Sequence, residues 1–175
     1  MIRGEDHKTR RVKHRDSEIP NEYAKNEIQF CDRKFYVDRR AYITDQDACL
    51  LVREVCKIIE SLSDNPVVID VGCGSGAIGL SIAMASKRIK HLLLTDISKV
   101  ALQVAKVNCT RFSVAGNLVV PTTFWESDLL KSIPDDVKYN NSYINLKDEH
   151  LILVCAPPYG SVKDVGFYSE ELRKN

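Results

Sequence analysis

Three glycines that follow a short apolar run form the most informative pattern in the sequence. Gly72, Gly74 and Gly76 come directly after Val-Val-Ile-Asp-Val, residues 67–71, and precede a second apolar stretch. Glycine lets a chain turn tightly and lets a ligand approach backbone that a side chain would block. Asp70 supplies a carboxylate next to the turn. These residue types favour a ligand-binding turn between a strand and a helix over a turn that binds nothing.

Two cofactor classes fit this turn. Gly74, Gly76 and Gly79 satisfy the G-x-G-x-x-G fingerprint of dinucleotide-binding folds, so NAD is one alternative. Asp70 and the additional Gly72 favour an acid-x-Gly-x-Gly-x-Gly loop, which resembles the cofactor loop of class I S-adenosylmethionine (SAM) methyltransferases. That resemblance implies that the acid orders the loop and faces the cationic end of the cofactor. It assigns five loop residues to SAM binding: Asp70, Gly72, Cys73, Gly74 and Gly76.

Further candidates for the cofactor site follow the next two expected strands. Asp96 ends Leu-Leu-Leu-Thr-Asp about 20 residues beyond the glycines, where an acid accepts hydrogen bonds from ribose hydroxyls. Ile97, its neighbour, is assigned to the same site. Asp128 matches the position at which methyltransferases keep a residue for the adenine amino group, and it could equally cap a helix. Trp125 also has two alternative roles: it packs on the adenine or belongs to the ordinary core.

The last apolar run, residues 151–155, is followed by a segment that indicates which kind of group accepts the methyl. Ala-Pro-Pro-Tyr resembles the Asn-Pro-Pro-Tyr motif of amino-group methyltransferases. A planar amide or exocyclic amine is a poor nucleophile, so acceptors must hold its N–H groups and turn the lone pair toward the methyl. Where the motif has Asn this chain has Ala, which leaves only a backbone carbonyl as the acceptor. The expected substrate site comprises Ala156, Pro157, Pro158 and Tyr159.

Strands that alternate with helices would bring these motifs together. Such alternation predicts a parallel sheet with right-handed crossovers. Thr44 and Asp47 form a capping-box signal before the first long helix. The polar segment 131–149 is expected to be a surface loop. The expected helices cover residues 45–62, 77–87 and 98–112, and the expected strands cover residues 67–71, 92–95, 118–124 and 151–155.

The N-terminal part of the chain has a different character. Residues 1–27 carry both charge signs without a period, which predicts a flexible polar arm, and residues 28–43 can pair as a short hairpin. We therefore divide the chain into an arm and hairpin, residues 1–40, and a cofactor-binding domain, residues 41–175.

Composition excludes several classes of protein. Among 175 residues, 25 Lys and Arg oppose 24 Asp and Glu, so the chain is not a strongly basic nucleic-acid coat. No apolar run approaches the ~18 residues of a membrane span, and the first residues lack the apolar core of a secretory signal. Six cysteines without a C-x-x-C pair predict reduced thiols, no metal site and a cytoplasmic location.

Taken together, the motifs resemble the protein-glutamine N5-methyltransferases of the HemK/PrmC release-factor family from about residue 41 onward. Val-Ile-Asp-Val-Gly-Cys-Gly-Ser-Gly is similar to the family's first motif, and T-D-I-S-x-x-A-L-x-x-A-x-x-N, residues 95–108, resembles its second. Residues 164–172 look like the family's helix after a shortened loop. The resemblance implies a Rossmann-like class I methyltransferase sheet, SAM as cofactor, and a protein substrate such as a release factor.

Three departures from the family pattern keep alternatives open. Ala156 replaces the catalytic Asn, and residues 1–40 hold no counterpart of the family's helical substrate-recognition domain. The sequence given also ends about 16 residues after Tyr159, where such a fold would still need three strands. We therefore expect a sheet truncated after its fourth strand, with a protein partner covering the open edge. An N6-adenine methyltransferase of RNA or DNA, and an inactive SAM-fold scaffold, are the alternatives.

Overall fold

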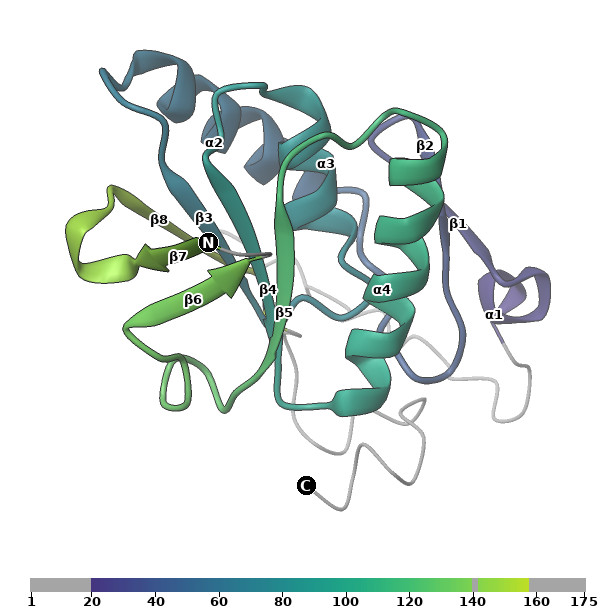
Figure 1. The fold of residues 1–175 in the computed structure, drawn as a ribbon. Coiled ribbons are helices and arrows are strands. Elements are labelled where there is room, and N and C mark those ends of the chain that lie inside the picture. Colours follow the sequence, from purple (N-terminus) through teal and green to yellow (C-terminus); the bar gives the residue numbers. More distant parts are fainter. Residues whose placement is uncertain (1–19, 140–141, 158–175) are drawn as a thin grey trace, which may run out of the picture.

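A four-stranded parallel sheet forms the centre of the computed structural model, which describes residues 20–139 and 142–157 (Figure 1). The strands are arranged in the order β5-β4-β3-β8, and all three pairings are parallel. The sequence prediction of an α/β fold with a mostly parallel sheet is therefore confirmed. The four strands are β3 (Val67–Val71), β4 (His91–Asp96), β5 (Thr122–Glu126) and β8 (Leu151–Cys155).

Three helices cover one face of this sheet: α2 (Ala48–Ser61), α3 (Ala77–Ala85) and α4 (Lys99–Val114). Successive side chains of a strand point to opposite faces, so Val68, Leu92 and Leu94 lie in one hydrophobic cluster with the helices. α3 is apolar on all sides and almost completely buried, as expected of a helix between a sheet and other helices. It packs on β3 and β4, whereas α4 packs on β4 and β5.

The opposite face of the sheet is covered by a hairpin that the sequence did not predict. β6 (Asp136–Tyr139) and β7 (Ser142–Asn145) pair antiparallel, and a short 3-10 helix, Leu146–Asp148, follows them (Figure 1). The expectation of a surface loop over 131–149 is wrong because Val137 and Leu146 are buried against β3 and β4. β6 and the 3-10 helix each bury one side chain and β7 buries none, which gave too little periodicity to recognise.

The N-terminal segment is also more ordered than expected. The expected hairpin is confirmed as β1 (Glu27–Phe30) and β2 (Arg33–Tyr36), and a short helix, α1 (Asn21–Lys25), precedes it inside the segment predicted to be flexible. The rest of that predicted arm, residues 1–19, lies outside the described residues. The rings of Phe35 and Phe112, on α4, are 4.9 Å apart. The hairpin thus shares the helix-side core, and the division after residue 40 stays a prediction.

The ends of several elements differ from expectation for local reasons. α2 begins three residues later than predicted, because Thr44 and Asp47 form no capping box and the Asp47 N–H is bonded to the Asp45 carboxylate at 3.0 Å. β5 begins four residues late because it follows Pro121, which has no N–H to donate to a sheet. α4 begins after Ser98, whose hydroxyl accepts a hydrogen bond from the Ala101 N–H.

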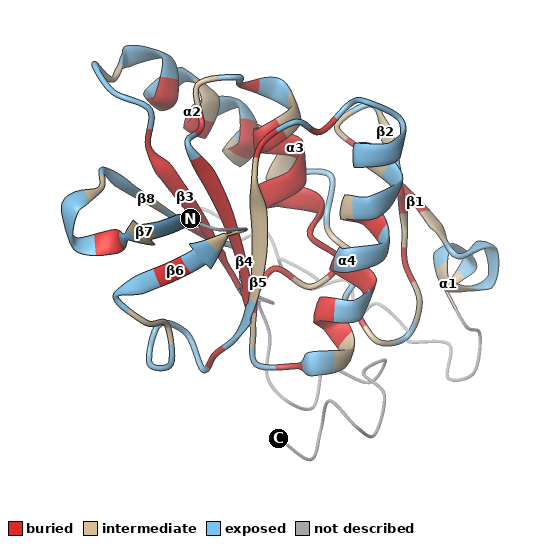
Figure 2. Ribbon diagram, in the orientation of Figure 1, coloured by how far each residue is buried: buried red, intermediate tan, exposed pale blue. Residues whose placement is uncertain are grey.

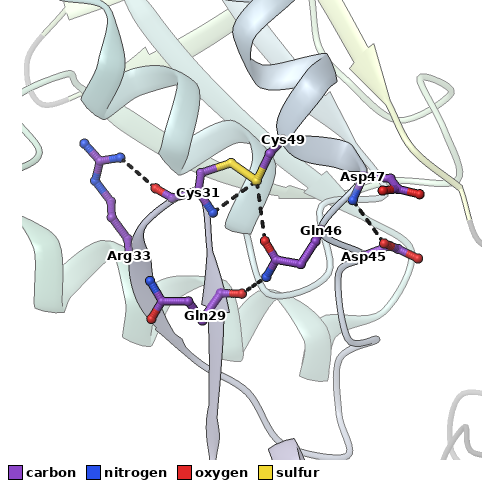
Figure 3. Close-up of a disulfide and its surroundings, with 7 residues drawn as sticks. All are labelled: Gln29, Cys31, Arg33, Asp45, Gln46, Asp47 and Cys49. Atoms are coloured by element: carbon purple, nitrogen blue, oxygen red, sulfur yellow. Dashed lines mark hydrogen bonds between the residues drawn. A yellow bond between two sulfur atoms is a disulfide. The ribbon is translucent and has the colours of Figure 1, made fainter.

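Two of the six cysteines form a disulfide, so the prediction of reduced thiols is wrong for this pair (Figure 3). Cys31 lies in the turn of the β1–β2 hairpin and Cys49 in the first turn of α2, with their Cα atoms 5.6 Å apart. Gln46 donates a hydrogen bond to the Gln29 carbonyl beside them. The 18-residue separation carried no signal, because tertiary packing brings the two segments together. The other four cysteines are free: Cys56, Cys73, Cys109 and Cys155.

Burial decreases from the middle of the sheet toward its edges (Figure 2). β3 is buried at every residue, whereas the edge strand β8 leaves Leu151 and Leu153 38% and 54% exposed. Their partners in the register, Val67 and Ile69, belong to the cluster under the β6–β7 hairpin. The hairpin therefore covers this face over β3 and leaves part of β8 open.

Candidate functional site

The glycine turn between β3 and α3 has an open side and a packed side. Gly72, Gly74 and Gly76 have φ angles of +72°, +54° and +76°, a region that other residues rarely adopt. A Cβ atom at Gly72 or Gly74 would meet nothing within 4 Å, whereas one at Gly76 would lie 3.1 Å from Leu80. The turn thus exposes bare backbone at its first two glycines, as required for the close approach of a ligand.

The end of β4 is tied directly to this turn through Asp96. One carboxylate oxygen of Asp96 accepts the Gly74 N–H at 2.9 Å, and the other accepts the Ser98 N–H at 2.9 Å. Burial raises the pKa of Asp96, against the lowering effect of these hydrogen bonds. A carboxylate offers about four lone-pair sites, so acceptor capacity remains for the hydroxyls of a ribose. The two main motifs predicted from sequence therefore meet.

Asp70 lies behind the turn. Its side chain is nearly completely buried, with 2% of the residue exposed, and accepts the Gly79 N–H at 2.8 Å. Burial raises the pKa of Asp70 to about 7, the Gly79 hydrogen bond opposes this, and the charge of Asp96 adds to it. The carboxylate links β3 to the first turn of α3, which agrees with the ordering role expected of it. Its direct approach to the cofactor stays a prediction.

The remaining predicted cofactor residues border the same end of the sheet. Cys73 is buried and donates its N–H to the Thr95 carbonyl at 2.8 Å, while Ile97, beside Asp96, is 49% exposed. The Ser127 N–H donates to the Asp96 carbonyl at 3.0 Å, which holds the end of β5 next to β4. The contacts of these residues with a cofactor stay predictions.

Asp128 and Trp125 have local partners beyond β5. Asp128 pairs with Lys131 within a turn, and no helix begins there among the described residues, so the helix-capping alternative is not realised. Trp125 donates its indole N–H to the Ser132 carbonyl at 2.6 Å and is partly exposed. Both side chains therefore remain candidates for the adenine end of the cofactor.

The predicted substrate segment starts beside the glycine turn. Val71 and Cys155 are partners in the parallel register of β3 and β8, so Gly72 and Ala156 leave the sheet from adjacent positions. Ala156 is half-buried and packs on the helix-side core, and Pro157 is exposed. Pro158, Tyr159 and the helix expected over 164–172 lie outside the described residues.

Asn108 is a site residue that the sequence analysis did not single out. It ends the second motif and is fully buried in α4, where its side chain bonds the carbonyls of Ser75, in the glycine turn, and Tyr36, in β2. An Asn among the apolar positions of a helix was the available signal.

The described residues contain neither a candidate metal site nor a candidate membrane-spanning helix. Within residues 20–139 and 142–157, no group of three His, Cys, Asp or Glu side chains could hold a metal ion. No helix in that same part of the chain has the length and hydropathy needed to cross a membrane.

Sequence comparison relates this chain to methyltransferases. A family model described as the methyltransferase small domain matches residues 43–163. A release factor glutamine methyltransferase of Leptospira interrogans is 30% identical over 88% of this chain and 49% of its own length. The corresponding protein of Bacillus subtilis is 28% identical over 89% of this chain and 49% of its own. The chain thus spans about half the length of these curated relatives.

Solved structures overlap the chain only in part. Magnesium protoporphyrin IX methyltransferase from Synechocystis, with bound SAM, is 25% identical over 51% of this chain and 40% of its own, with a TM-score of 0.38. Trm5b from Pyrococcus abyssi is 16% identical over 58% of this chain and 28% of its own, with a TM-score of 0.42. Overlaps this limited carry no argument about function.

The geometry and the family model agree on the cofactor. Open backbone at Gly72 and Gly74, with acceptor capacity on Asp96 beside them, fits a nucleoside cofactor, and the family model favours SAM over NAD. The cofactor of this site is therefore SAM. Because the matched model covers well over half of the sequence and extends from the segment before α2 past the end of β8, the chain belongs to the methyltransferase small domain family.

Proposed function

We propose that the chain is a SAM-dependent N-methyltransferase whose acceptor is a glutamine side chain of a protein such as a release factor. The observation that carries this proposal is the register of β3 and β8, in which Val71 pairs with Cys155. The cofactor turn and the segment from Ala156 therefore leave the sheet next to each other, which gives the proximity that group transfer requires. The names of the curated relatives support the glutamine acceptor.

Each part of the site has a defined task in this proposal. SAM, when bound, supplies an electrophilic methyl group on a sulfonium cation. Asp96 accepts hydrogen bonds from the ribose, and the open backbone at Gly72 and Gly74 lets the cofactor lie against the turn. The Ala156 carbonyl accepts one N–H of the acceptor amide, and the ring of Tyr159 packs on the amide plane. Together these contacts orient the nitrogen lone pair toward the methyl group.

The deciding experiment measures transfer of a tritiated methyl group from SAM. Its acceptors are a release factor that carries a Gly-Gly-Gln motif, the same factor with that glutamine replaced by alanine, and total RNA. The proposal expects label on the unmodified release factor and background counts on the alanine form. Label on RNA alone would instead identify the adenine-directed alternative.

Ala156 motivates a second candidate, a SAM-fold scaffold without catalytic activity. Losing one positioned hydrogen bond in a transition state costs about 3–4 kcal/mol, a factor of roughly 10² to 10³ in rate. If the chain transfers methyl slowly, Ala156→Asn should raise the rate by about that factor. Label that appears only in Ala156→Asn, with none in the wild type, would favour the scaffold.

A protein partner along β8 and a cytoplasmic location complete the proposal. Leu151 and Leu153 are exposed on a strand that, among the described strands, pairs only with β3, and such an edge is a template for another chain. Leu153→Lys should therefore weaken capture of a release factor or of a second copy in a crosslinking assay. The location is tested by cell fractionation against a cytosolic marker, because the Cys31–Cys49 disulfide is of a kind that is rare in the cytosol and does not itself support this location.

A further inference from the structure

Asn108 joins three segments that are far apart in the sequence. Its side-chain oxygen accepts the Tyr36 N–H at 2.7 Å. Its side-chain nitrogen donates to the Tyr36 carbonyl at 2.9 Å and to the Ser75 carbonyl at 2.9 Å. One side chain of α4 therefore holds the end of β2 against the middle of the glycine turn.

Asn108 is buried, so its side-chain amide needs hydrogen-bond partners inside the protein. The residue is fully buried, and Val104 and Ala105, about one helical turn earlier, are fully buried apolar side chains. A primary amide placed there without partners would lose its hydrogen bonds to water and gain nothing in exchange. An apolar residue would pack as well, but it would leave the backbone groups of Tyr36 and Ser75 without these partners. The three hydrogen bonds are therefore what the position requires.

The bond to Ser75 acts directly beside Gly74, where the backbone of the turn is open. Ser75 is fully buried between Gly74 and Gly76, both of which have positive φ. Asp96 holds the Gly74 N–H from the side of β4, and Asn108 holds the Ser75 carbonyl from the side of α4. The backbone at Gly74 and Ser75 is thus held from two directions.

We propose that Asn108 is a positioning residue that couples docking of the β1–β2 hairpin to the shape of the SAM-binding turn. The inference rests on SAM binding at this turn and adds a dependence on a segment outside it. The N–H and the carbonyl of Tyr36 are both bonded by the same side-chain amide that holds Ser75. Displacement of the hairpin therefore removes the support of the turn, and displacement of the turn releases the hairpin.

The test compares SAM titrations of wild type, Asn108→Ala and Val104→Ala, at a temperature where circular dichroism shows all three to be folded. Val104→Ala is the packing control: Val104 lies in the same helix and packs beside Tyr36, but it makes no hydrogen bond to Tyr36 or to the turn. We expect Asn108→Ala to weaken SAM binding at least tenfold and Val104→Ala to change it less than twofold. Equal effects of the two variants, or a change below twofold for Asn108→Ala, would overturn the proposal.

A second variant tests the coupling without touching the turn, and covers the case in which Asn108→Ala does not fold. Phe35→Leu loosens the packing of the hairpin on Phe112 and leaves Asn108 intact. We expect it to weaken SAM binding at least threefold, and an unchanged dissociation constant refutes the coupling.

Hydrogen exchange separates failure of this inference from failure of the cofactor assignment. The Gly76 N–H is bonded to the Cys73 carbonyl within the turn at 2.8 Å. Asn108→Ala should accelerate its exchange at least tenfold, and Val104→Ala should not. This readout stands even if the wild type binds no SAM, a result that would refute the assignment of SAM to the site. Unchanged exchange at Gly76 would refute the positioning role itself.

Discussion

Gly79 is the position at which the packing behind the cofactor turn can be tested most directly. It lies inside α3, where alanine would normally be the better helix former by about 1 kcal/mol. A Cβ atom there would lie 2.7 Å from Leu94 Cδ2, 2.8 Å from Asp70 Oδ2 and 2.9 Å from Asp70 Cβ. The gain in helix propensity therefore opposes a steric conflict with two buried side chains.

The conflict should dominate in Gly79→Ala. Leu94 can shift a terminal methyl, but Asp70 Cβ is fixed to the central strand β3, so α3 itself must move away. Overpacking of a core costs about 1–3 kcal/mol. The same movement stretches the hydrogen bond from the Gly79 N–H to Asp70. Subtracting the propensity gain leaves about 0–2 kcal/mol, and the weakened hydrogen bond adds up to about 1 kcal/mol. We therefore expect a net loss of about 1–2 kcal/mol and, at ~2–4 °C per kcal/mol, a Tm lower by roughly 2–8 °C.

Urea denaturation followed by circular dichroism measures this loss. Leu94→Ala, alone and combined with Gly79→Ala, completes a double-mutant cycle, because it removes the shortest of the three contacts. The combined variant should lose about 1 kcal/mol less free energy of unfolding than the sum of the two single losses. Gly79→Ala that equals or exceeds the wild type in stability would refute the reasoning.

Three further predictions follow from the same contacts. Because burial on folding raises the pKa of Asp70 from 3.8 to about 7, the chain should lose stability as pH rises between these two values, and Asp70→Asn should flatten that part of a pH series of urea titrations. Gly74→Ala should cost about 1 kcal/mol from its positive φ but weaken SAM binding at least tenfold in calorimetry, because the added methyl enters the open side. Replacing Cys31 and Cys49 by Ser should cost about 3 kcal/mol in non-reducing denaturation. Alkylation of acid-quenched wild type should then give four reactive thiols, and six would contradict the disulfide.

The parts of the fold that the sequence predicted are those with strong local patterns. Strands β3 and β8 are continuous apolar runs with Pro, Gly or polar residues at their ends, and their predicted bounds agree with the structure. The β6–β7 hairpin was missed because its burial depends on a sheet face formed by strands distant in sequence. The disulfide was missed for the same reason, because Cys31 and Cys49 come together only through the packing of the β1–β2 hairpin on α2.

In the candidate site, too, local sequence patterns predicted some residues, and tertiary packing alone explains the others. Gly72, Gly74 and Asp96 could be found because they lie at or just beyond the carboxyl ends of two adjacent parallel strands. The pairing of Asp96 with the Gly74 N–H follows from that topology, although no spacing rule gives the distance. Asn108 could not be found in this way, because its partners lie 33 and 72 residues away and belong to different layers of the fold.

The glycine motif by itself does not determine the shape of its turn. Positive φ at three glycines lowers the cost of the turn in the folded chain but also gives the unfolded chain many alternatives. The observed shape is selected by three side chains outside the loop: Asp70 at Gly79, Asp96 at Gly74, and Asn108 at Ser75. Two of these belong to strands that the motif already implies, and the third brings in α4 and the N-terminal hairpin. Cofactor binding should therefore depend on the β1–β2 hairpin, residues 27–36, as well as on the motif, and a fragment that begins at β3 should bind SAM more weakly than the full chain.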